Sequence, residues 1–349
     1  MTVKKNQHYV PQFYLRLFSV NEQESQIGLF YLTKEFFKQS VPLKSQAKED
    51  YFYGADGYFE EELSKLESIC APHFKTIITA NIIPKRQSSA YLSTLVFTIV
   101  MSNRTKDTAE KIKETTNKMA KELMSYDENL KDKIENIGIY PTEPAAMALA
   151  TISEQIPICF DLKLKLVVNK TNLKFITSDN PVIKYNQFLE QRKHQGGNVG
   201  LATKGLQLFF PISPNHMLCF YDEWVYKIGD KSNDIITIDN IDDIEKLNYL
   251  QVLNCYDHLY FDDTITEYYL RTLFKKAKSK LQTEYSNLQK THSYVDEEGQ
   301  EHIFYHSYNY NLEVNLSLSF ITQTKRAKRH ILSDFAVQLR DESLRQKRR

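Results

Sequence analysis

The chain begins with a dense group of polar and aromatic residues, QHYVPQFYL at 7–15. An imidazole titrates near neutral pH and can act as a general acid or base with little tuning, so His8 is a candidate catalytic residue. Pro11 favours an extended backbone before it, so His8 and Tyr9 should point to opposite sides of the chain. Such a segment could deliver His8 and Gln12 into a pocket. The alternative is a packed N-terminal arm in which the histidine is only hydrogen-bonded.

Three polar residues follow one another at the end of an apolar stretch, in KFITSDNPVIKY at 174–185. Pro181 cannot extend a strand, so Ser178, Asp179 and Asn180 should lie where the strand ends. Asp179 could orient an imidazole or hold a divalent metal ion such as Mg²⁺, while Ser178 and Asn180 could contact a substrate. A turn in which Ser178 or Asp179 only caps backbone amides fits the local sequence equally well.

Arg104 and Glu67 are the other charged candidates. Arg104 follows the apolar residues of IVMSNRTKDT at 99–108, where a guanidinium could bind a phosphate or carboxylate through two hydrogen bonds, or simply cap the end of a helix. Glu67, in EEELSKLES at 60–68, lies between apolar positions of a predicted helix. It could be a second metal ligand beside Asp179, or a partner base.

Composition narrows the classes of function. The 349 residues are 42% hydrophobic and include 20 Phe and 22 Tyr, which indicates a packed core rather than disorder. With 45 basic and 44 acidic residues the net charge is only +1, so binding to nucleic acid would need a local basic patch. The ten glycines argue against Gly-rich phosphate loops, and the sequence contains no Walker A, GxGxxG, GxSxG, HExxH or CxxC motif.

Cysteine usage and hydropathy bear on the compartment. Four isolated cysteines indicate reduced, buried thiols rather than a disulfide framework; they are Cys70, Cys159, Cys219 and Cys255. The most apolar run, YLSTLVFTIV at 91–100, is too short to span a bilayer. The first residues lack the apolar region of a secretion signal. We therefore expect a cytoplasmic protein that does not associate with membranes.

Hydrophobic periodicity predicts a helical first half and a strand-rich second half. Helices are predicted at 59–78, 88–102, 105–137, 241–255 and 264–290. Strands are predicted at 25–37, 162–169, 174–179, 181–186, 206–213 and 216–222, with an edge strand at 302–314. This pattern predicts an α+β fold, in which the helical N-terminal half covers a mixed or antiparallel sheet. Residues 1–262 would form the main domain, and 263–349 would add C-terminal helices and a basic tail packed on it.

Two charged segments are candidate surfaces for partners. The stretch 105–137 carries Glu and Lys three or four residues apart, which most simply indicates a solvated helical face. The same helix could bind a protein partner or a second copy of the chain. The basic tail contains Arg326, Lys328 and Arg329, which could contact the backbone of RNA or DNA.

The chain resembles the domain of unknown function 4238 (DUF4238) family of bacterial proteins. The resemblance is carried, in the family's order, by HYVPQFYL (8–15), ELSKLE (62–67), the apolar helix before Arg104 and Thr105, ITSDNPV (176–182), FPISP (210–214) and KLNYLQVLNCYDHLYF (246–261). It covers roughly residues 6–262. Lys106 departs from the proline expected after Arg104 and Thr105. The resemblance implies an intracellular bacterial protein of accessory type and implies no established chemistry.

The family pattern singles out polar residues that packing alone does not explain, namely His8, Gln12, Glu67, Arg104, Asp179 and Asn180. We expect these six to converge on one site. The sharpest form of this expectation is a distance: the His8 ring and the Asp179 carboxylate should lie within about 3 to 6 Å of each other, in direct or water-bridged hydrogen-bond range.

Two functions of different classes fit this pattern. The first is a phosphodiesterase, such as a nuclease of a bacterial defence or toxin system. His8 would then transfer protons, Arg104 would stabilise phosphoryl charge, Asp179 and Glu67 would hold any metal, and Gln12 would position the substrate. The second is a non-catalytic sensor or interaction module whose polar pocket binds a nucleotide or a phage component.

Overall fold

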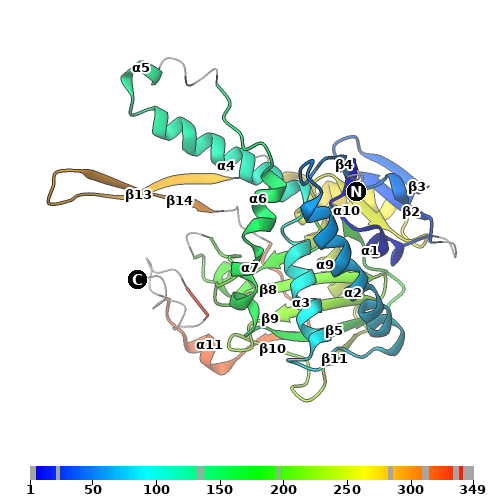
Figure 1. The fold of residues 1–349 in the computed structure, drawn as a ribbon. Coiled ribbons are helices and arrows are strands. Elements are labelled where there is room, and N and C mark those ends of the chain that lie inside the picture. The colour runs from blue at the N-terminus through cyan, green and yellow to red at the C-terminus, as the bar shows by residue number, and fades with distance from the viewer. Residues whose placement is uncertain are drawn as a thin grey trace.

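The fold is built around two sheets whose strands come from distant parts of the chain (Figure 1). The computed structural model describes residues 5–20, 24–131, 134, 137–194, 197–281, 286–308, 314–332 and 338–340. Within these residues the architecture is α+β, as the sequence predicts.

The larger sheet has five strands in the order β11-β5-β9-β8-β7. Their bounds are β5 (Lys163–Asn169), β7 (Ile183–Tyr185), β8 (Gln207–Ser213), β9 (His216–Tyr221) and β11 (Ile235–Ile238). β11 pairs with β5 in parallel and the other neighbours are antiparallel, so the sheet is mixed. These strands confirm the predictions at 162–169, 181–186, 206–213 and 216–222. β7 is an edge strand, which matters for the site described below.

The second sheet joins the N-terminal region to the segment that ends in Ser178. Its order is β3-β2-β12-β6, all antiparallel. The strands are β2 (Gln26–Tyr31), β3 (Phe36–Pro42), β6 (Thr177–Ser178) and β12 (His258–Phe261). The predicted strand at 25–37 therefore divides into β2 and the start of β3, separated by a turn. β12 lies between β2 and β6, so it brings residues 177–178 and 26–31 into one layer.

Helices from the N-terminal half cover one face of the larger sheet (Figure 1). They are α1 (Gln12–Arg16), α2 (Tyr58–Ala80) and α3 (Ser89–Met101). Phe74 of α2, Phe97 of α3 and Phe210 of β8 meet with ring centroids 5.2 to 6.2 Å apart, in the main hydrophobic core. Pro72 lies inside α2 and does not end it.

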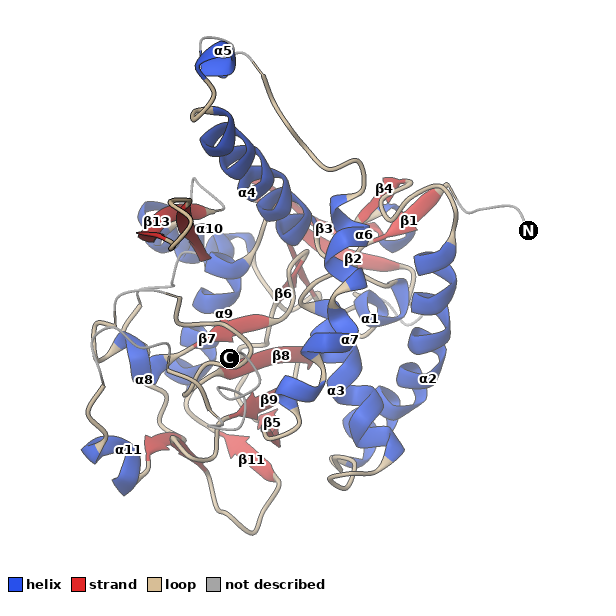
Figure 2. Cartoon of the chain, turned by 60° about the vertical axis from the view of Figure 1, so that its left-hand side comes forward, coloured by secondary structure: helices blue, strands red, loops and turns tan. Residues whose placement is uncertain are grey.

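A helix and a hairpin project together from the body of the molecule (Figures 1 and 2). The helix is α4 (Lys106–Met124), followed by α5 (Glu128–Lys131), and the hairpin is β13 (Asn287–Val295) with β14 (Glu301–Tyr308). Two predictions needed correction here. The helix predicted at 105–137 ends at Met124, and α5 is a separate short helix. The helix predicted at 264–290 is present only as α10 (Glu267–Ala277). The residues from Asn287 do not continue it, because they pair with β14.

Apart from α9, the remaining described elements are short. They are β1 (Asn6–His8), β4 (Lys48–Asp50), β10 (Tyr226–Ile228), β15 (Ile321–Gln323), α6 (Pro144–Ala150), α7 (Ile152–Gln155), α8 (Gln187–Glu190), α9 (Ile241–Asn254), α11 (Lys325–Arg329) and the 3₁₀ turns at Leu43–Ser45, Pro157–Cys159 and Lys278–Lys280. Of the predicted basic tail, 333–337 and 341–349 lie outside the described residues. In the described part of the chain, no helix combines the length and apolar character that crossing a membrane requires.

Candidate functional site

Asp179 is fully buried and fastens the loop that follows α9. Its Oδ1 accepts hydrogen bonds from the Tyr256 amide (2.9 Å) and the Cys255 thiol (3.4 Å). Its Oδ2 accepts from the amides of Asp257 (2.9 Å) and His258 (2.8 Å) and contacts the His258 ring at 3.3 Å. Both oxygens of this carboxylate are therefore engaged by donors of the chain. This geometry matches the alternative in which Asp179 caps backbone amides.

Ser178 and Asn180 extend the same hydrogen-bonded group. The Ser178 hydroxyl accepts from the Asn180 amide (3.0 Å) and the Gln251 side chain (2.6 Å). The Asn180 side chain donates to the Asn254 carbonyl (2.9 Å) and to Asp107 Oδ2 (3.1 Å). The SDN segment thus ties the end of α9 to the start of α4.

Arg104, just before α4, is the centre of a second group. Its side chain is buried, and it donates from Nη1 to Glu67 Oε1 (2.7 Å), from Nη2 to the His8 carbonyl (2.7 Å) and from Nε to the Tyr53 hydroxyl (3.1 Å). Burial alone would lower the pKa of Arg104, but Tyr53 and Glu67 raise it above its ordinary value, so the guanidinium stays charged. Arg104 therefore joins β1, α2 and the α3–α4 junction.

The His8 ring lies at the edge of this second group. Its Nε2 is 3.2 Å from Gln12 Nε2 and 3.4 Å from the Lys44 carbonyl oxygen. Burial lowers the pKa of His8 below its ordinary value, although the hydrogen bond with Lys44 opposes this. Burial therefore favours the neutral form of the imidazole.

The structure brings four of the six predicted residues together and leaves two in a different group. His8, Gln12, Glu67 and Arg104 are linked through the contacts above. Asp179 and Asn180 contact residues of the α9–β12 connection and α4. No hydrogen bond or ion pair joins the His8 ring to the Asp179 carboxylate in the described ranges. The same ranges contain no group of three or more His, Cys, Asp and Glu side chains arranged to hold a metal ion. Glu67 forms an ion pair with Arg104 and does not join Asp179 in a metal site.

The basic residues predicted to bind nucleic acid lie elsewhere. Arg326, Lys328 and Arg329 belong to α11, at the end of the molecule away from α4 (Figures 1 and 2). Arg326 donates to the carbonyls of Trp224 (2.9 Å) and Glu223 (3.1 Å) and lies over the Trp224 ring. These residues do not line the cavity described next.

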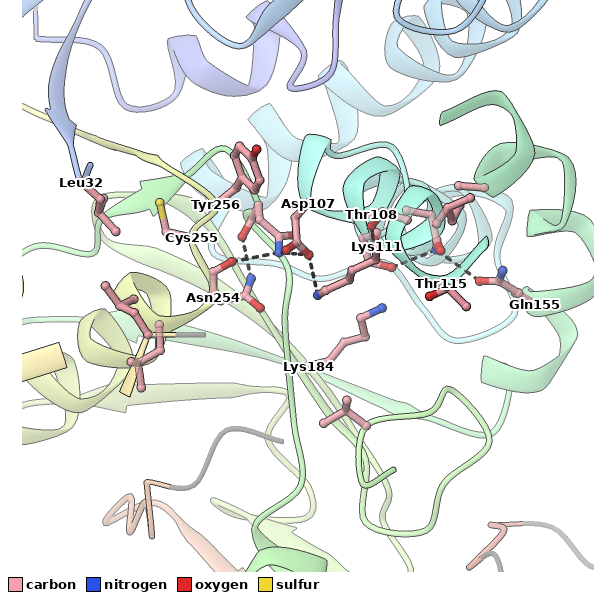
Figure 3. A pocket seen from close by; sticks show the side chains of 18 of the residues that line it. Leu32, Asp107, Thr108, Lys111, Thr115, Gln155, Lys184, Asn254, Cys255 and Tyr256 are labelled. Carbon is pink, nitrogen blue, oxygen red and sulfur yellow. Dashed lines mark hydrogen bonds and ion pairs between the residues drawn. The ribbon is translucent and has the colours of Figure 1, made fainter. Parts of the chain in front are cut away.

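A cavity of about 590 Å³ lies between α4, the end of α9 and the β7 edge of the larger sheet (Figure 3). The polar side chains lining it come from five parts of the chain: Thr33; Ser102, Asn103, Asp107, Thr108, Lys111, Thr115 and Thr116; Thr151 and Gln155; Asn180 and Lys184; and Asn254, Cys255 and Tyr256. Cavities of roughly 300 to 1,000 Å³ are typical of small-molecule sites. Asn180 is the one residue predicted for the site that lines this cavity.

Lys184 extends into the cavity from the edge strand β7 (Figure 3). Its strand neighbours Ile183 and Tyr185 are buried in the hydrophobic core on the opposite face, and strand alternation therefore directs Lys184 to the cavity side. Among the residues that the structure describes, its ammonium has no hydrogen-bond or ion-pair partner. Burial, and then the positive charge of Lys111, lowers the pKa of Lys184 to about 8, although Asp107 and Cys159 act in the opposite direction.

Lys111 and Asp107 form an ion pair on the wall opposite Lys184. Lys111 Nζ lies 2.7 Å from Asp107 Oδ2, one helical turn apart on α4. The Asn180 side chain donates to the same Asp107 oxygen at 3.1 Å. One carboxylate thus faces two lysines, so the cavity carries an excess of positive charge when Lys184 is protonated. Such a site favours an anionic ligand.

Two of the predicted residues fix segments that form the cavity wall. The sequence analysis did not identify the two lysines that line the cavity, Lys184 and Lys111. Asp179 fixes the loop that contributes Cys255 and Tyr256, and Arg104 fixes the junction from which α4 starts. Two signals could have revealed Lys184 and Lys111. Lys184 is a lone cation between Ile183 and Tyr185 in a predicted strand, and Asp107 and Lys111 share one face of a helix interpreted as solvated.

A family model described as protein of unknown function (DUF4238) matches residues 6–264. The match begins at β1 and ends just after β12, so it includes the residues of both hydrogen-bonded groups and most of the cavity wall. Phe274 and Leu281, which also line the cavity, follow the matched region. No curated protein and no solved structure matches the chain.

We predict that Asp179→Ala lowers the free energy of unfolding by about 3 kcal/mol, because three backbone amides lose their acceptor at a buried position. Urea denaturation measures the change. Asp263→Ala is the matched control, since Asp263 is exposed and should tolerate the change. Equal stabilities of the two variants would contradict a structural role for Asp179.

Arg104→Met should lower the free energy of unfolding by about 2 to 4 kcal/mol, because it removes a buried guanidinium that satisfies Glu67, Tyr53 and the His8 carbonyl. Lys65→Met removes a cation that also contacts two carboxylates but is exposed, and it should leave stability unchanged. Denaturation of both variants tests the contrast. A loss for Lys65→Met as large as that for Arg104→Met would refute it.

Lys184→Met should stabilise the protein by about 1 to 3 kcal/mol at pH 7, because the native state no longer holds a partly desolvated ammonium that has no partner among the described residues. The folded pKa lies below the unfolded one. The gain should therefore be full below pH 8 and should fade as the pH rises from about 8 toward the ordinary lysine pKa. Denaturation at pH 7 and pH 10 measures both, and a gain that does not depend on pH would disprove the argument.

Proposed function

The chain belongs to the DUF4238 family, whose description assigns no activity, and we propose from the cavity itself that the protein binds a small anionic ligand there. The observation that carries this proposal is Lys184, an ammonium without a hydrogen-bond partner in the described chain that points into a cavity of about 590 Å³. Lys184 is only partly exposed, and a charged group that loses part of its hydration without gaining a partner is unfavourable unless a ligand supplies one. A carboxylate or phosphate in the cavity would supply the missing partner.

The other polar side chains support recognition of a metabolite-sized molecule. Lys111 is held by Asp107, so its charge is fixed in place at the wall of the cavity. Hydroxyls of Thr108, Thr115 and Thr116 on the same helix add donors and acceptors. Leu253 and Phe274 add apolar surface to the lining of the cavity. A few polar groups set in a partly apolar cavity are typical of sites for small ligands.

This proposal is closest to the second of the functions that the sequence suggests, a non-catalytic sensor or interaction module that binds a nucleotide or a phage component. The phosphodiesterase function stays a prediction. The contacts of its proposed residues do not favour it, since Arg104 donates to Glu67, Tyr53 and the His8 carbonyl, and Asp179 accepts from backbone amides. In this conformation neither side chain presents its charged atoms to a shared cavity.

We predict that inorganic phosphate and adenosine 5′-monophosphate raise the melting temperature of the wild-type chain, because a ligand that binds only the native state stabilises it. Lys184→Met should lose most of this shift. Lys113→Met should retain it, because Lys113 lies on the same helix but pairs with Glu110 and does not line the cavity. Thermal unfolding is followed at constant ionic strength with chloride as the reference anion. Equal shifts in the wild-type and Lys184→Met chains would exclude this site.

A further inference from the structure

We infer that Lys184 is a nucleophilic amine that forms an imine with a small aldehyde or ketone carrying a carboxylate or phosphate group, an inference that rests on the proposed anion-binding function. The geometry consists of an amine without a partner among the described residues, a cavity large enough for a metabolite, and a fixed cation on the facing wall. These are the requirements for bringing an anionic carbonyl compound against an amine and holding it there.

The amine must be neutral to react, and the surroundings of Lys184 increase the fraction that is neutral at pH 7. Burial and the neighbouring Lys111 charge lower the pKa of Lys184 to about 8. At pH 7 roughly one such amine in ten is neutral, against fewer than about one in a thousand for an ordinary lysine. Desolvation beside a second cation is a general way to activate a lysine for attack on a carbonyl group. Asp107 and Cys159 are the other titratable groups that act on Lys184, and both oppose the shift.

Lys111 has a different environment and therefore a different role. Its ammonium is paired with Asp107 Oδ2 at 2.7 Å. It would attract the anionic group of the ligand while Lys184 attacks the carbonyl carbon. The Asp107 Oδ1 atom accepts no hydrogen bond from the described residues, so it could accept and return a proton during the reaction.

The reaction balances without an oxidant or a reductant. The nitrogen lone pair of Lys184 forms a bond to the carbonyl carbon while the carbonyl π electrons move to oxygen. The nitrogen loses a proton and the oxygen gains one, which gives a carbinolamine. Loss of the hydroxyl group as water, with a second proton transferred to it, gives the imine. The overall change is one carbonyl compound and one amine converted to one imine and one water.

The test uses the full chain with glyoxylate, the smallest aldehyde that carries a carboxylate, and sodium cyanoborohydride to reduce any imine formed. Peptide mapping by mass spectrometry compares the rate of modification at Lys184 with that at Lys113. At pH 7 we expect Lys184 to react at least about tenfold faster. The rate at Lys184 should level off above pH 8, whereas the rate at Lys113 should still rise at pH 10. Equal rates and parallel pH profiles would overturn the inference.

A variant of Lys111 tests whether Lys184 reacts quickly because its pKa is lowered or only because reagents can reach it. Lys111→Met removes the positive charge that lowers the pKa of Lys184 and should slow its modification at pH 7 by about threefold or more, with the pH profile moved upward. Lys113→Met should change neither. An unchanged pH profile in a folded Lys111→Met chain would count against the inference. If Lys111→Met does not fold, the wild-type pH profile decides.

The two proposals fail separately. If phosphate stabilises the wild-type chain through Lys184 but glyoxylate does not modify Lys184 preferentially, the imine inference is wrong and anion binding stands. If phosphate gives no shift and does not protect Lys184 from glyoxylate, the anion-binding function itself is wrong. Protection of Lys184 by phosphate, together with slower reaction of acetaldehyde, which lacks the anionic group, would support both.

Discussion

A carboxylate with no accessible surface, Asp179, organises the centre of this protein. It accepts hydrogen bonds from the amides of residues 256–258 and thereby fixes the connection between α9 and β12. Since β12 is the middle strand joining β2 to β6, the position of the second sheet depends on this connection. Removing a carboxylate from water is unfavourable unless donors replace the lost hydration, and backbone amides supply that replacement here.

Arg104 makes a second set of connections, between the residue just before α4 and three other segments of the chain. Its donors reach Glu67 on α2, the Tyr53 hydroxyl and the carbonyl of His8. One guanidinium therefore satisfies three acceptors from separate segments, which its planar fork of donors allows and an ammonium would not. The backbone of the N-terminal segment is therefore tied to the body of the protein as an acceptor for a buried cation.

These two groups fix segments that form part of the cavity wall. Asn180 and the loop at Cys255 and Tyr256 are fixed through Asp179, and α4 starts from the junction fixed by Arg104. Between them Lys184 faces Lys111 and Asp107 without a hydrogen-bond partner of its own in the described residues. The charges of Asp179 and Arg104 are paired within the chain, whereas Lys184 lies beside the cavity without a partner among the described residues, and this contrast supports the proposal that a ligand pairs with it.

The sequence alone determined the α+β class, the strands at 162–169 and 206–222, and the importance of the segments around His8 and Asp179, because hydrophobic periodicity and residue type are local properties. It could not determine the roles of these polar residues. From the sequence, an aspartate at the end of a strand could equally be a catalytic group or a cap for backbone amides. The hydrogen bonds from residues 256–258 show that Asp179 caps amides. The sequence shows Lys184 only as a lone cation in an apolar strand, because its partial burial and its position facing Lys111 and Asp107 depend on α4 and β7 meeting across the cavity.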